Sequence, residues 1–97
     1  MIHEAEPGVA SHRQTNLHFR ADNPSQAYDV FIDLSGAISH ASVAAGDDLR
    51  IIPIGDLGDQ AHLFIRTQAA DGTIGVYDVY WDGPSCSASG LVDVATP

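Results

Sequence analysis

The sequence contains no lysine, and this shortage of positive charge limits the partners that it can bind. Its four cationic side chains are all arginines, against 13 acidic residues, which gives a formal net charge of −9. Cationic groups bind phosphate by displacing counterions, so this balance argues against nucleic acid and anionic membranes as partners. The acidity is typical of a surface that keeps a small protein in solution.

Cysteine and long apolar runs are also scarce. The one cysteine, Cys86, lies in a loop-like stretch, GPSCSASG, and forms neither an internal disulfide nor a zinc site of several thiolates. No run approaches the ~20 apolar residues of a membrane helix, and the opening MIHEAEPGVASHRQ has no apolar segment of a secretory signal. A lone thiol fits a reducing compartment better than a secreted one. These features slightly favour a cytoplasmic location.

Alternation of apolar and polar residues with a period of two runs through most of the chain, and no helical stripe is present. Such alternation, bounded by Gly, Asn, Asp and Pro, is typical of half-buried antiparallel strands. It predicts an all-β fold, a small antiparallel β-sandwich of Ig-like or jelly-roll-like type with six to seven strands. The candidate strands are 15–21, 27–34, 37–44, 48–54, 61–69, 73–81 and 90–95.

The ends of the strands also carry signals. Residues 1–14 lack the alternation, so we expect a flexible N-terminal arm followed by a single sandwich domain over 15–97. Asp71-Gly72 between two alternating segments predicts a tight hairpin. Pro53 cannot donate to a strand ladder, so its strand is expected at a sheet edge or at a bulge.

One seven-residue phrase occurs twice, as AYDVFID at 27–33 and as VYDVYWD at 76–82. A Leu-x-apolar-Arg segment precedes each copy, LHFR at 17–20 and LFIR at 63–66. We interpret the repeat as two equivalent hairpins, 15–34 and 61–82, related by a pseudo-twofold axis. A chance match in a chain rich in Asp and Val is the alternative.

The alternation assigns the side chains of the two expected hairpins to opposite faces. A one-residue slip would bury aspartates, so the register is firmly set. The inward set is Leu17, Phe19, Tyr28, Val30, Ile32, Leu34, Leu63, Ile65, Tyr77, Val79 and Trp81. The outward set includes Asp29, Phe31, Asp33, Asp78, Tyr80 and Asp82.

The expected turns predict which outward side chains face each other across strands. In the first hairpin, a turn at 23–26 would set Arg20 opposite Asp29 and His18 opposite Phe31. In the second, a three-residue loop around Gly72 would set Arg66 opposite Asp78 and Phe64 opposite Tyr80. Each Arg–Asp pair would contribute roughly 0.2–1 kcal/mol and would fix the pairing.

The outward aromatics require a cover, because a contiguous exposed apolar patch marks a contact site. A loop or the N-terminal arm, a protein surface, or a sugar ring would each serve, and aromatic anchors among polar residues suit protein interfaces best. We therefore expect a non-enzymatic interaction or structural module that contacts a protein partner or forms a homo-oligomer. The expected contact residues are Phe31, Phe64, Tyr80, Asp29, Asp78, Arg20, Arg66 and His18.

Two further functions stay open. A carbohydrate-binding module assisted by calcium would use loops rich in Asp and Gly, with Asp56 and Asp59 as the first metal ligands to test, although Asp and Gly are also ordinary turn residues. A small enzyme would use a His and an Asp for acid–base catalysis, but no catalytic motif is present. His18, His40 and His62 lie on different expected strands, so surface histidines are favoured over a metal site, and no cofactor is expected.

Overall fold

The computed structural model describes residues 15–82, 85–87 and 90–95, which form eight β-strands and no helix that could cross a membrane. Their bounds are β1 (Thr15–Arg20), β2 (Tyr28–Leu34), β3 (Ala37–Val43), β4 (Leu49–Gly55), β5 (Gln60–Ala69), β6 (Ile74–Asp82), β7 (Ser85–Ser87) and β8 (Val92–Ala95). The predicted arm, residues 1–14, lies outside the described residues.

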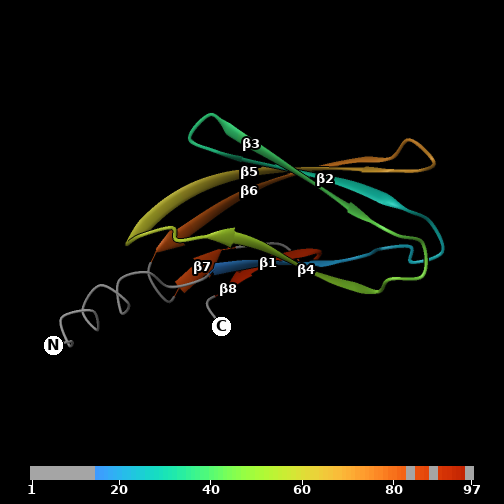
Figure 1. The fold of residues 1–97 in the computed structure, drawn as a ribbon, viewed down its shortest axis with the longest axis horizontal. Coiled ribbons are helices and arrows are strands. Elements are labelled where there is room, and N and C mark those ends of the chain that lie inside the picture. Colours follow the sequence, from blue (N-terminus) through green and yellow to red (C-terminus); the bar gives the residue numbers. More distant parts are fainter. Residues whose placement is uncertain (1–14, 83–84, 88–89, 96–97) are drawn as a thin grey trace, which may run out of the picture.

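The predicted all-β sandwich is confirmed. One antiparallel sheet has the order β4-β1-β8 and the other has the order β3-β2-β5-β6-β7, and Figure 1 shows them as two layers. All seven candidate segments form strands. The eighth, β7, corrects the loop-like interpretation of the stretch around Cys86, because this residue pairs with Trp81 of β6.

Pro53 occupies the position that its chemistry requires. Its strand, β4, lies at the edge of the three-stranded sheet. The register with β1 shifts beside it, because Asn16 faces Pro53 while Thr15 faces Gly55, so Ile54 is the extra residue of a bulge. The strand of Pro53 therefore lies at a sheet edge and also contains a bulge, so the prediction is confirmed.

The predicted hairpin 15–34 does not form. β1 pairs with β4 and β8, whereas β2 pairs with β3 and β5 in the other sheet. The connection over residues 21–27 crosses between the sheets and is held there by neighbours far along the chain. Ala21 N–H donates to the carbonyl of Asp48, and Gly46 N–H donates to that of Pro24. Arg20 is therefore not opposite Asp29, and His18 is not opposite Phe31.

The predicted hairpin 61–82 does form, as β5 and β6, but with a shifted register. Its loop is Ala70-Asp71-Gly72, closed by a bond from Ala69 N–H to the carbonyl of Thr73 at 2.8 Å. Gly72 ends the loop at a φ of 92°, which favours glycine. The expected loop is centred one residue later. Opposite Arg66 therefore lies Val76 rather than Asp78, and opposite Phe64 lies Asp78 rather than Tyr80.

The two copies of the repeated phrase lie in β2 and β6. Both strands run antiparallel to β5, which lies between them, so they are parallel to each other in one sheet. A translation across the sheet relates parallel strands, so the predicted pseudo-twofold axis is wrong.

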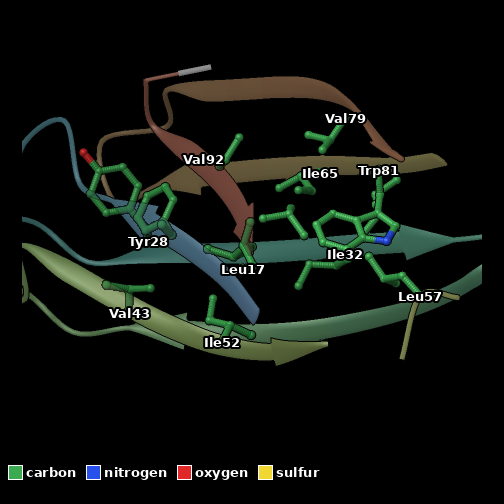
Figure 2. Packing of buried hydrophobic residues seen from close by; sticks show 14 of the residues in the cluster. Leu17, Tyr28, Ile32, Val43, Ile52, Leu57, Ile65, Val79, Trp81 and Val92 are labelled. Carbon is green, nitrogen blue, oxygen red and sulfur yellow. The ribbon is translucent and has the colours of Figure 1, made fainter. Parts of the chain in front are cut away.

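The core lies between the layers, as Figure 2 shows for Leu17, Ile52, Ile65 and Val79. All eleven side chains predicted to point inward belong to it, with Leu34 and Tyr77 partly buried and the others buried. Burying one large apolar side chain stabilises the fold by roughly 1.5–3 kcal/mol. The short three-stranded sheet completes the core with Ile52 of β4 and with Val92 and Val94 of β8.

Trp81 connects the core to the loop between β4 and β5. Its indole is buried beside Leu57 in Figure 2, and its Nε1–H donates to the carbonyl of Gly58 at 3.2 Å. A buried indole N–H needs such a partner. The bond fixes the loop that leads into β5 and so helps to position that strand.

A polar clasp closes the opposite end of the sandwich, where the connection 21–27 meets the β5–β6 turn. Asp71 N–H donates to Oε1 of Gln26 at 3.1 Å, and Ala70 N–H donates to the carbonyl of Ala27 at 2.9 Å. Oδ1 of Asp71 accepts from Thr73 N–H at 2.9 Å. The hydrogen bonds from Thr73, backbone first, and from Gln26 lower the pKa of the Asp71 carboxyl below its ordinary value of 3.8.

We predict that Val79→Ala lowers the free energy of unfolding by about 2 kcal/mol, because it removes buried methyl groups and leaves a cavity. Val76→Ala, three positions earlier on the same strand, should change it by no more than about 0.5 kcal/mol, because Val76 is 70 % exposed and Val79 is fully buried. Urea unfolding measures both. An equal loss in the free energy of unfolding for the two variants would contradict the assignment of faces along β6.

A second prediction concerns acid. A carboxyl whose pKa is lowered by folding binds fewer protons in the folded chain than in the unfolded chain, so its stabilising effect is complete above the unfolded value and is lost as the pH falls through the folded value. Asp71→Asn should therefore flatten the fall in stability below about pH 4. Unfolding midpoints of both proteins across that range test this, and identical pH profiles would contradict a role for the Asp71 carboxylate.

Candidate functional site

The outer face of the five-stranded sheet, the side that points away from the three-stranded sheet, collects most of the exposed apolar surface. Seven large apolar side chains are exposed in the described part of the chain, and five of them lie on this face. They are Ile38, Phe64, Ile74, Val76 and Tyr80. Exposed apolar side chains therefore gather on one face of one sheet, and such a face is the first place to look for a contact site.

Phe31 stands at the centre of this face between two cationic or titratable neighbours. His40 on β3 and Arg66 on β5 lie directly opposite Phe31 on its two sides. The His40 ring stacks on it with centroids 4.7 Å apart, and the Arg66 guanidinium carbon lies 4.6 Å from its centroid. Such a cation–π contact contributes about 0.5–1 kcal/mol at an exposed site. Both flat sides of the ring are thus covered by side chains of the same sheet.

His62 organises a second group of rings. It lies directly opposite Tyr80, and their ring centroids are 4.1 Å apart with an interplanar angle of 14°. The Phe64 ring packs against the same imidazole at 4.5 Å. Nε2 of His62 also contacts Oδ1 of Asp78, an ion pair when the imidazole is protonated.

The two groups share one arrangement, and the repeated phrase supplies it. In each copy an Asp precedes an aromatic residue by two positions, as Asp29 precedes Phe31 and Asp78 precedes Tyr80. A histidine on the adjacent strand faces the aromatic ring and contacts the Asp, as Nε2 of His40 does with Oδ1 of Asp29 at 3.0 Å. The phrase therefore serves to hold a ring and a carboxylate around a cross-strand imidazole.

A shallow hollow lies between these groups. Its walls are Phe31, Ile38, Phe64 and Val76, its charged residues are Asp33 and Arg66, and Ile65 contributes to the floor. We call it the outer hollow. Its volume is about 500 Å³, within the range of ordinary ligand pockets, although it is open rather than enclosed. It has room for an apolar side chain, with one carboxylate and one guanidinium at its rim.

The structure brings together six of the eight predicted contact residues. Phe31, Phe64, Tyr80, Asp29, Asp78 and Arg66 share the outer face. The other two, His18 and Arg20, lie on β1 in the other sheet, where they point away from the core. Their place in the predicted set depends on the hairpin 15–34, and that hairpin does not form.

Sequence reasoning missed the partners that fill the space between the rings. His40 and His62 contact both rings and carboxylates, and Ile38 and Val76 wall the outer hollow. The alternation could have placed all four on the outward side. It could not show which strands are neighbours, and the ring stacks depend on that.

The weak calcium candidates lie in the loop between β4 and β5. Oδ1 of Asp56 accepts a hydrogen bond from Gly58 N–H at 2.8 Å, which is the turn chemistry expected of an Asp two residues before a Gly. In residues 15–82, 85–87 and 90–95, no three His, Cys, Asp or Glu side chains are grouped so that they could hold a metal ion. Asp56 and Asp59 therefore stay a prediction that only a binding measurement can test.

Comparison with known proteins adds no identity. No protein-family model matches the chain, and searches of curated proteins and of solved structures likewise gave no match. The function must be argued from the geometry of the outer face.

We predict an energetic coupling between Arg66 and Phe31. A double-mutant cycle with Arg66→Ala and Phe31→Leu should give a coupling free energy of about 0.5–1 kcal/mol in unfolding measurements, because each single substitution removes the cation–π contact. The control cycle, Arg20→Ala with Asp29→Ala, should give coupling within about 0.5 kcal/mol of zero, because these residues lie in different sheets. A larger coupling in the control than in the test cycle would contradict the observed strand pairing.

Proposed function

We propose that this chain is a non-enzymatic interaction module whose outer face binds a protein surface. The observation that carries the proposal is the outer hollow, where exposed apolar walls surround a space for one anchoring side chain and two charged groups stand at the rim. Binding energy at protein interfaces is concentrated in such anchors, placed in pockets near the centre of the contact.

The orientation of the rings favours a protein over a sugar. A sugar stacks on the flat side of an aromatic ring, so it needs an open platform. The flat sides of Phe31 are covered by His40 and Arg66, and one side of Tyr80 is covered by His62. What these rings offer to a partner is mainly their edges, a ridged apolar surface that fits the side chains of another protein.

The charges of the face indicate the chemistry of the partner. Asp29, Asp33, Asp78 and Asp82 lie on it, with Arg66 as its arginine. A second copy laid face to face would set carboxylates against carboxylates, which costs free energy. The fitting partner therefore presents an apolar anchor surrounded by Arg or Lys side chains.

A carbohydrate ligand is the second candidate, and one observation favours it. A groove of about 480 Å³ beside the outer hollow is lined by Tyr80, His62, Gln60 and Asp82 among others, so a ring edge there adjoins groups that bind hydroxyls. A glycan array with and without EDTA tests both this candidate and the assistance of calcium. Sugar binding that the chelator abolishes would replace the protein proposal.

We predict that selection of a phage-displayed library of random peptides on the wild type enriches sequences with an aromatic or aliphatic anchor and nearby Arg or Lys. Phe64→Ala combined with Val76→Ala removes two walls of the outer hollow. This double variant should bind the selected peptides with an affinity that is lower by roughly tenfold or more. Isothermal titration with synthetic peptides measures the loss, and circular dichroism verifies that the variant is folded.

The matched control is Leu49→Ala combined with Ile51→Ala. These two side chains are 44 % and 52 % exposed and lie on β4, in the other sheet. Their truncation removes a similar amount of exposed apolar surface and should leave peptide affinity unchanged. No enrichment, or equal losses in both double variants, would contradict the assignment of the outer face.

A further inference from the structure

The five-stranded sheet ends at β3, and this edge has none of the usual protection against another strand. β3 pairs with β2 over all seven residues without a bulge, and no further strand of the described part of the chain lies on its other side. Its sequence, AISHASV, contains no Pro, Arg, Asp or Glu, and its first four residues are exposed. An edge strand of seven residues without a bulge presents a row of backbone groups to which another strand can add.

The other edges of the described sheets are protected in recognised ways. β4 contains Pro53, Arg50 and the bulge at Ile54. β8 has four residues and carries Asp93, and β7 has three residues. Proline, bulges, charge and short length are the devices that keep edges from pairing. The contrast singles out β3 as the edge that the sequence leaves open.

Charge also favours approach at β3. The chain carries 13 acidic residues, yet β3 has none. The two carboxylates on the neighbouring strand are already engaged, since Asp29 contacts His40 and Oδ1 of Asp33 accepts from Gly36 N–H at 2.9 Å. Two copies that meet along this edge therefore bring together strands without arginines or carboxylates, and the carboxylates of β2 beside them already have partners.

We propose that β3 pairs antiparallel with β3 of a second copy, so that two five-stranded sheets become one continuous sheet. Full overlap of residues 37–43 places the twofold axis at His40 and sets Ile38 opposite Ser42 of the second copy. In this register the two His40 side chains meet at the axis, and no arginine or acidic side chain of β3 faces another. The pairing uses the edge and leaves the outer face open, so each dimer would present two outer hollows side by side to the partner proposed above.

The test is light scattering with size exclusion at concentrations well above micromolar. The wild type should have twice the mass of one chain, and added salt should favour the dimer by screening the net charge. Ile38→Lys with Ser42→Lys sets one lysine opposite another across the axis and should give a monomer. Ile38→Lys alone sets each lysine opposite the neutral Ser42 of the second copy and should leave the dimer intact.

The first of these variants should fold, because within the chain the two introduced lysines, at positions 38 and 42, would face Asp33 and Asp29 respectively. If this variant does not fold, hydrogen exchange of the wild type tests the dimer instead. Protection of the amides in 37–43 should then rise with protein concentration.

The proposal would be overturned if the wild type is monomeric, or if the variant with both lysines is folded and still dimeric. It would also be overturned if amide hydrogen exchange in β3 does not depend on protein concentration. A dimer that is lost on Phe64→Ala with Val76→Ala would overturn it too, because that result would assign self-association to the outer face. Peptide binding to that face is measured separately, so either proposal can fail while the other holds.

Discussion

The period-two alternation of side chains along β2, β5 and β6 is the constraint on which the rest of the structure depends. Val30, Ile65 and Val79 are fully buried, so the residues beside them in the chain must point to solvent. A slip of one residue would bury aspartates without partners in β2 or β6, and the Arg66 guanidinium in β5, which costs far more than one lost apolar contact. The rings and acids of the outer face are therefore fixed by the same burial that holds the two sheets together.

The outer face and the β3 edge divide the surface of the sheet between two kinds of contact. On the face, ring stacks and His–Asp contacts fix the orientation of the Phe31 and Tyr80 side chains. Exposed apolar side chains surround the outer hollow beside them. At the edge, backbone groups are the means of association. Since a sheet twists but stays continuous when a strand is added, pairing at the edge changes the number of faces presented and not their composition. Protein recognition by the face and self-association by the edge are thus compatible proposals.

The sequence predicted strands and faces well and strand partners poorly, for a physical reason. Alternation is local, so it placed Phe31 and Phe64 outward whatever their neighbours. Pairing is decided by the connections, and residues 21–27 serve equally well as a long hairpin loop or as a crossing between sheets about 10 Å apart. Hydrogen bonds that join this connection to the 46–48 turn, distant in the chain, select the second. The β5–β6 register changed for a similar reason, because the φ of one glycine decides where a three-residue loop ends.

The most direct test of this account is a set of nuclear Overhauser effects between ring protons in solution. Strand order β3-β2-β5-β6 predicts contacts from the Phe31 ring to the His40 ring and to the Arg66 side chain, and from the His62 ring to the Tyr80 ring. Contacts between His18 and Phe31 instead would show that β1 and β2 pair as a hairpin, and the outer face described above would not exist.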